Sequence, residues 1–110
     1  MTHRDLALAF LHRFAAGDVD GLEPLLAEDL RVKGPYLTVR SRAEYLAALR
    51  RDPPEPSGLR VLSVTENDDS VAVFYEYEKR DGALAVAQLF RFRGEQIREL
   101  RVVFDSGEFG

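Results

Sequence analysis

The 110-residue sequence predicts an α+β fold, with three N-terminal helices packed on a curved, mostly antiparallel sheet. Two observations predict this class. Apolar residues recur at helical spacing through the first half of the chain, and runs of alternating apolar residues fill the second half. One domain over residues 1–110 is expected, because the linker-like stretch DPPEPSG at 52–58 is too short to separate two domains.

The first helix is predicted over residues 3–16. Its apolar face repeats every four residues, through Leu6, Phe10 and Phe14. Thr2 can cap the start of this helix, and Gly17 suits a left-handed stop at its end. The helix therefore has one face to bury against the sheet.

Two further helices and a short strand are predicted before residue 54. A short helix capped by Asp18 or Asp20 runs through Leu26, with Pro24 in an early turn or at a kink. Residues 30–33 alternate and indicate a short strand. The capping-box sequence SRAE at 41–44 opens the third helix, which the prolines at 53 and 54 end.

The second half predicts an antiparallel meander, with strands at 59–66, 71–80, 83–93 and 97–105. Asp81-Gly82 is typical of a type I′ hairpin, and Gly94-Glu95 suits a type II′ turn. The first of these turns pairs Arg80 with Ala83, so Tyr75 is expected opposite Gln88. The sequence AVAQLFRF at 85–92 then places one amide on an inner face that is otherwise apolar and aromatic.

The last strand does not alternate cleanly. Ile97 is expected to pair with Phe92 on the inner face, but Leu100, Val102 and Phe104 form a second alternating series out of phase with it. A β-bulge near Arg98-Glu99 would turn all four inward. A miscounted register, or a helix through Ile97, Leu100 and Phe104, is the alternative.

The composition argues against several classes of function. The net charge is −4 without a basic block, so no nucleic-acid partner is expected. Cysteine is absent, and His3 and His12 share no ligand spacing, so no metal and no cofactor are expected. The charged N-terminus fits neither a signal peptide nor a membrane span, which favours a cytoplasmic location without a membrane partner.

Three segments resemble the SnoaL-like branch of the nuclear transport factor 2-like superfamily. They are FLHRFAAGDVDGLEPLLAEDLRVKGP at 10–35, SRAEYLAAL at 41–49 and VAQLFRFRGEQIRELRVVFD at 86–105. The resemblance implies a cone-shaped α+β barrel that encloses a pocket, and homodimers packed through the sheet. Related proteins include ketosteroid isomerases, polyketide cyclases, epoxide hydrolases and dehydratases, so the fold alone does not supply a function.

The resemblance also implies where catalytic groups would lie. The isomerase base falls at Gly34, the tyrosine of the first helix at Phe10, and the acid of the third long strand at Gln88. The carboxylate of the cyclase and hydrolase branches falls at Val102, and that of the preceding hydrolase strand again at Gln88. None of these side chains titrates near neutral pH, although an amide still donates and accepts hydrogen bonds.

We therefore expect a domain that binds a small, largely apolar or amphipathic molecule, without a catalytic residue of the isomerase type. The expected ligand pocket comprises Phe10, Phe14, Tyr36, Tyr75, Gln88, Phe90, Val102 and Phe104. The alternative for Gln88 is that it serves only to satisfy the hydroxyl of Tyr75 or Tyr77. Two alternatives stay open: an enzyme of the superfamily with a relocated catalytic residue, and a dimeric interaction module with a filled pocket. The apolar strip of Phe74, Ala87, Leu89 and Val103 on the outer sheet face motivates the homodimer.

Overall fold

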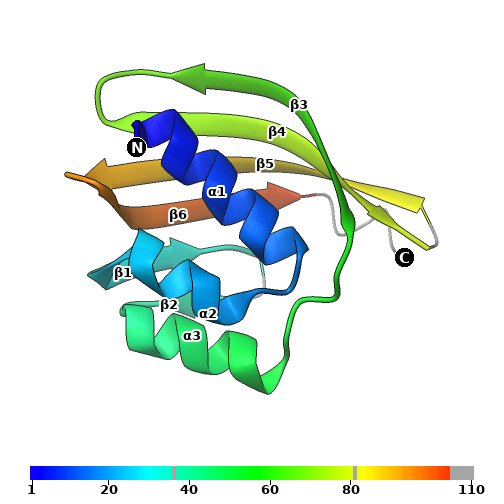
Figure 1. Ribbon diagram of the computed structural model, residues 1–110, viewed down its shortest axis with the longest axis horizontal. Coiled ribbons are helices and arrows are strands. Elements are labelled where there is room, and N and C mark those ends of the chain that lie inside the picture. Colours follow the sequence, from blue (N-terminus) through cyan, green and yellow to red (C-terminus); the bar gives the residue numbers. More distant parts are fainter. Residues whose placement is uncertain (36, 81, 105–110) are drawn as a thin grey trace.

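The computed structural model describes residues 1–35, 37–80 and 82–104, in which three α-helices lie on one face of a six-stranded sheet (Figure 1). The helices are α1 (His3–Ala15), α2 (Val19–Leu22) and α3 (Arg42–Arg51), with a short 3-10 helix, η1 (Glu23–Leu25), after α2. The strands are β1 (Leu26–Lys33), β2 (Thr38–Val39), β3 (Gly58–Glu66), β4 (Ser70–Lys79), β5 (Gly82–Arg93) and β6 (Gln96–Phe104). No helix among these residues is long and apolar enough to cross a membrane.

The sheet has the strand order β2-β1-β6-β5-β4-β3, and all neighbours are antiparallel except β1 and β6, which are parallel. It curves around α1 without closing (Figure 1). The predicted class, α+β with N-terminal helices on a curved and mostly antiparallel sheet, is confirmed. The core lies between this inner face and the helices, where Phe10, Leu30 and Leu100 are buried.

The predicted helix caps form. The hydroxyl of Thr2 accepts from the backbone N–H of Asp5 at 3.1 Å, and the Asp5 carboxylate accepts from the N–H of Thr2 at 3.1 Å. Gly17 ends α1 with a φ of 76°, a conformation that glycine adopts without strain. Ser41 caps α3, while the Glu44 carboxylate accepts from the N–H of Arg40 instead of closing a reciprocal box.

The second helix is shorter than predicted. It ends at Leu22 instead of Leu26, because Pro24 lacks the N–H that an α-helix needs and instead sits near the start of η1. β1 consequently begins at Leu26, four residues before the predicted start. β2, which was not predicted, pairs with β1 through Val32 and Val39.

The four strands of the meander match the predicted ranges to within one residue, but the β4–β5 register differs. Lys79 pairs with Gly82, so Tyr75 lies opposite Val86 and not opposite Gln88. The predicted turn was wrong because Gly82 belongs to β5, where it has a φ of 131°. A shift of two residues keeps every side chain on its predicted face, because the side-chain period of a strand is two.

The predicted bulge in β6 is confirmed. Phe92 pairs with Ile97 and Arg91 pairs with Glu99, which leaves Arg98 as one extra residue in β6. In the turn before it, Gly94 has a φ of 60° and the next residue, Glu95, does not have a positive φ. This is the combination that a type II′ turn requires. The helical alternative for this segment is therefore wrong.

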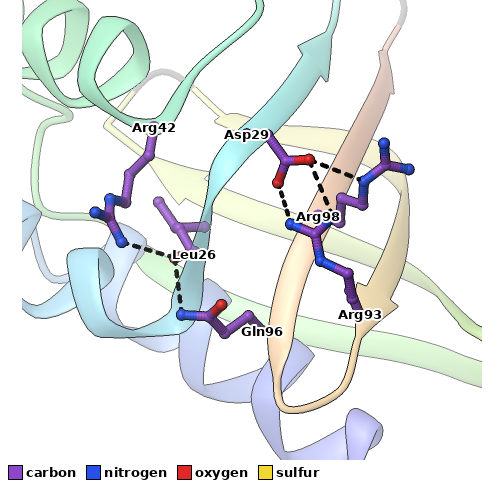
Figure 2. A network of polar contacts seen from close by, with 6 residues as sticks. All are labelled: Leu26, Asp29, Arg42, Arg93, Gln96 and Arg98. Carbon is purple, nitrogen blue, oxygen red and sulfur yellow. Dashed lines mark hydrogen bonds and ion pairs between the residues drawn. The ribbon is translucent and has the colours of Figure 1, made fainter.

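The parallel pairing of β1 with β6 is interrupted between Leu26 and Arg31. At this interruption the backbone carbonyl of Leu26 accepts hydrogen bonds from Arg42 at 3.2 Å and Gln96 at 3.4 Å (Figure 2). Beside it, the carboxylate of Asp29 accepts from Arg93 on β5 and from Arg98, the bulge residue of β6. Side chains thus join the strands where the backbone ladder does not.

The hydrogen bond from Arg93 lowers the pKa of Asp29 from 3.8 to about 2. A carboxylate with a lowered pKa stabilises the folded state above its unfolded pKa, and that contribution disappears as the pH falls through the folded pKa. Asp29→Asn is therefore expected to lower the melting temperature slightly at pH 7, and the difference from wild type should close between about pH 4 and pH 2. Thermal melts followed by circular dichroism across this range measure it.

The matched control is Asp68→Asn, which removes a turn carboxylate that makes no ion pair with the described residues. The melting temperature of this variant should change with acidic pH in the same way as that of the wild type. A constant difference between Asp29→Asn and wild type down to pH 2 would contradict the assignment of the lowered pKa to this pairing.

Candidate functional site

A cavity of about 150 Å³ lies between α1, α3 and the inner face of the sheet. Ten of the described side chains line it: Phe10, Phe14, Tyr45, Tyr75, Tyr77, Leu84, Val86, Gln88, Val102 and Phe104. The helices contribute Phe10, Phe14 and Tyr45, and the alternation of β4, β5 and β6 presents the remainder. Amphipathic helices and period-two strands therefore meet around a space whose walls are mainly apolar.

Gln88 is the single amide in this lining, and it is only 5% exposed. The Tyr75 hydroxyl donates to its Oε1 at 2.6 Å. The two residues are diagonal neighbours across β4 and β5, because Gln88 pairs directly with Val73. The amide nitrogen donates to no described protein group, so it is the donor that this amide can offer to a bound molecule.

The tyrosines in the lining are kept in their neutral form by burial. Burial raises the pKa of Tyr45 and of Tyr75 far above the usual value, and raises that of Tyr77 to about 12. No described side chain of the lining belongs to Asp, Glu, His, Lys or Arg. At neutral pH the described walls of the cavity are consequently uncharged.

A second cavity of about 170 Å³ adjoins the first and shares Phe14, Tyr45, Val102 and Phe104 with it. Its other walls are Val32, Gly34, Pro35, Leu37 and Leu49, which belong to β1, the segment after it, and α3. A Cβ atom at Gly34 would meet the nearest atom, the Cβ of Val102, at 3.7 Å, an ordinary contact. Sterically, therefore, the site could hold a larger residue than the glycine found there.

The structure brings together most of the residues predicted for the pocket. Phe10, Phe14, Tyr75, Gln88, Val102 and Phe104 line the first cavity. Phe90 does not, because it is fully buried and Phe10 packs edge-on against its ring at 5.7 Å between centroids. Tyr36 lies outside the described residues.

Four lining residues were missing from the predicted pocket: Tyr45, Tyr77, Leu84 and Val86. Signals for them existed in the sequence. Tyr77 and Val86 lie on the inner face that alternation predicts, Leu84 continues that series, and Tyr45 shares the buried face of α3. The pattern identified the face but not how far along each strand the cavity extends.

Comparisons with known proteins agree with this architecture. The family model described as "SnoaL-like domain" matches residues 7–100. An NTF2-like protein of unknown function from Cytophaga hutchinsonii ATCC 33406 aligns with a TM-score of 0.83 and 21% identity, over 99% of this chain and 95% of that chain. No protein in the curated set matches the sequence.

Two further solved structures are similar. A hypothetical protein with a ketosteroid isomerase-like fold from Catenulispora acidiphila DSM 44928, in complex with trimethylamine, has a TM-score of 0.76 and 18% identity over 96% of this chain and 88% of that chain. An uncharacterized bacterial protein with a cystatin-like fold from Silicibacter pomeroyi DSS-3 has a TM-score of 0.77 and 20% identity, over 94% of this chain and 75% of that chain. At these identities the likeness establishes the fold alone.

The Tyr75–Gln88 hydrogen bond makes a testable contribution to stability. Tyr75→Phe and Gln88→Met are each expected to destabilise the protein by about 1–3 kcal/mol, because each leaves a buried polar group without its partner. The double variant should be less destabilised than the sum, with a coupling of about 0.5–1.5 kcal/mol. Urea denaturation of the four proteins measures this coupling, and strictly additive effects would contradict the bond.

Proposed function

Because the chain belongs to the SnoaL-like domain family, in the nuclear transport factor 2-like superfamily, we propose that it binds a small, largely apolar molecule in the cavity around Gln88. The observation that carries the proposal is a cavity whose described walls are uncharged and include one amide, Gln88, with a nitrogen that donates to no described protein group. Apolar pockets with a few well-placed polar groups are the usual form of small-molecule sites. A cytoplasmic location is part of the proposal and rests on the sequence alone.

The size of the cavity limits the ligand. A space of about 150 Å³ accommodates a molecule about the size of benzene, and the adjoining space of about 170 Å³ offers room for a substituent. Burying apolar surface supplies the affinity, at roughly 25 cal/mol per Å². The Gln88 amide then orients a hydrogen-bond acceptor on the ligand, because its carbonyl oxygen is already bonded to Tyr75.

The proposal does not include isomerase-type catalysis. The positions where the resemblance places a base, a tyrosine and an acid are Gly34, Phe10 and Gln88, and none can exchange a proton near neutral pH. An enzyme with a relocated catalytic group would need a titratable side chain at the cavity, and none of the described lining residues supplies one with a pKa near neutrality. The trimethylamine complex of the Catenulispora acidiphila protein supports binding of a small molecule by this fold.

A homodimer through the outer sheet face is the second part of the proposal. Phe74 and Val103 are 58% and 66% exposed, and they share one cross-strand row with Ala87 between them. A groove of about 310 Å³ lies over this apolar strip. Contiguous exposed apolar residues on a sheet are typical of interaction sites, and a two-fold axis through the strip would cover it in both copies.

Ligand binding can be tested with a matched pair of probes, cyclohexanone and methylcyclohexane, in NMR titrations of the wild type. Both should bind saturably, with cyclohexanone tighter by about two- to tenfold because it accepts from Gln88. Gln88→Met should remove this preference. Val102→Phe should abolish binding of both probes, since it fills the space that the two cavities share.

The control for the filled cavity is Val103→Phe, which adds the same side chain at the next residue, on the outer face. It should bind both probes like wild type. If neither probe nor a wider set of similarly sized apolar molecules binds the wild type saturably, the proposal is wrong. If binding persists in Val102→Phe, the ligand does not occupy this cavity.

If the proposed homodimer forms, the wild type should sediment as a dimer in sedimentation velocity at micromolar concentration. Val103→Glu should give a monomer, because it places a charge within the apolar strip that the dimer would bury. Ala47→Glu is the control, since Ala47 is also an exposed apolar residue but lies on α3, on the other face of the sheet. Sedimentation of the wild type as a single monomeric species would contradict the proposed dimer, but it would not bear on the proposed ligand binding.

A further inference from the structure

A groove of about 330 Å³ opens on the outer face where β2, β1 and β6 lie side by side. Its lining is Arg31, Val32, Lys33, Thr38, Val39, Arg40, Glu99 and Arg101. The four cationic members are exposed and Glu99 is half-buried, while Val32 and Val39 turn their side chains to the core. The groove is therefore separate from the two inner cavities, and its described lining has four cationic side chains against one carboxylate.

The ladder places two of these cations directly opposite each other. Lys33 of β1 pairs in register with Arg101 of β6. Like charges on directly opposed residues of neighbouring strands destabilise a sheet, unless an anion lies between them. Nothing in the strand pattern requires a cation at both positions, because each points away from the core.

Among the described residues, one carboxylate forms an ion pair with this pair of cations. The Glu99 carboxylate accepts from the Nε of Arg101 at 2.7 Å, and it pairs in the ladder with both Arg31 and Arg91. Arg31, Lys33 and Arg40 form no ion pair with any described residue. One carboxylate thus serves a group of several cations.

The arginines near the other end of the β1–β6 pairing do have a carboxylate partner. Asp29, two residues before Arg31 on β1, binds Arg93 and Arg98 (Figure 2). The fold therefore supplies a carboxylate to two arginines at one end of the β1–β6 seam and leaves the groove at the other end cationic. The chain as a whole carries a net charge of −4, so overall composition does not account for this local excess.

We propose that this groove binds a phosphate group, free or as the monoester of a small molecule. Cations from three adjacent segments surround the groove, and a tetrahedral dianion can accept hydrogen bonds from several directions at once. Arginine adds a planar fork that matches two phosphate oxygens, and the Thr38 hydroxyl at the rim adds a neutral donor. The site does not depend on the inner cavity or on its ligand.

The experiment is a ¹H–¹⁵N NMR titration of the full chain with inorganic phosphate, with sodium chloride adjusted to hold the ionic strength constant. Saturable shifts are expected at the amides of residues 31–33 and at Arg101, with a Kd on the order of a millimolar, as exposed charge pairs allow. Lys33→Gln should weaken binding roughly two- to fivefold, and Lys33→Glu more strongly. A parallel titration with glycerol 3-phosphate distinguishes the two sources, because tighter binding than phosphate identifies the monoester.

Arg60→Gln and Arg60→Glu are the matched controls, since Arg60 is an exposed cation of the same face, on β3 at the opposite edge. Both should bind phosphate like wild type. A stability measurement adds a second readout: without phosphate and at low salt, Lys33→Gln should melt above wild type, because it removes the opposed charges. Shifts that chloride reproduces, or equal losses in the Lys33 and Arg60 variants, would overturn the proposal.

Discussion

The single extra residue in β6, Arg98, is the constraint on which the interior depends. Because the side-chain period of a strand is two, an unbulged β6 with Ile97 inside would turn Leu100, Val102 and Phe104 to the outer face. With the bulge, Leu100 is buried in the core, while Val102 and Phe104 line both inner cavities. The same change of phase sends Arg101 and Val103 outward, so the cationic groove and the apolar strip also follow from it.

Gln88 adds an amide to the interior without making it charged. An ionised carboxylate at this depth would require a counterion, and none of the described lining residues provides a cation. An amide needs only hydrogen-bond partners, and Tyr75 supplies one of them. The absence of a titrating group among the described walls of this space is the basis on which we propose recognition and not proton transfer.

Much of the fold was predictable because each element has a local cause. The alternation of β4–β6 specified the inner face even though the hairpin register was two residues off, since an even shift preserves facing. The phase break after Ile97 located the bulge. The parallel β1–β6 pairing, the edge strand β2 and the cation group of Lys33 and Arg101 were not predictable, because they depend on contacts between residues far apart in the chain. Phe90 faces inward as expected, yet it misses the cavity because Phe10 covers it.

The parallel pairing of β1 with β6 also has a consequence for how the chain folds. β3 to β6 pair with their neighbours in sequence, so the meander closes short loops, whereas Leu26 and Ile97 are roughly seventy residues apart. The entropy of closing that long loop is compensated only once β6 is in place. During synthesis the edge of β1 that β6 covers therefore stays unpaired until β6 has left the ribosome, and an unpaired strand edge is a site at which chains can associate wrongly.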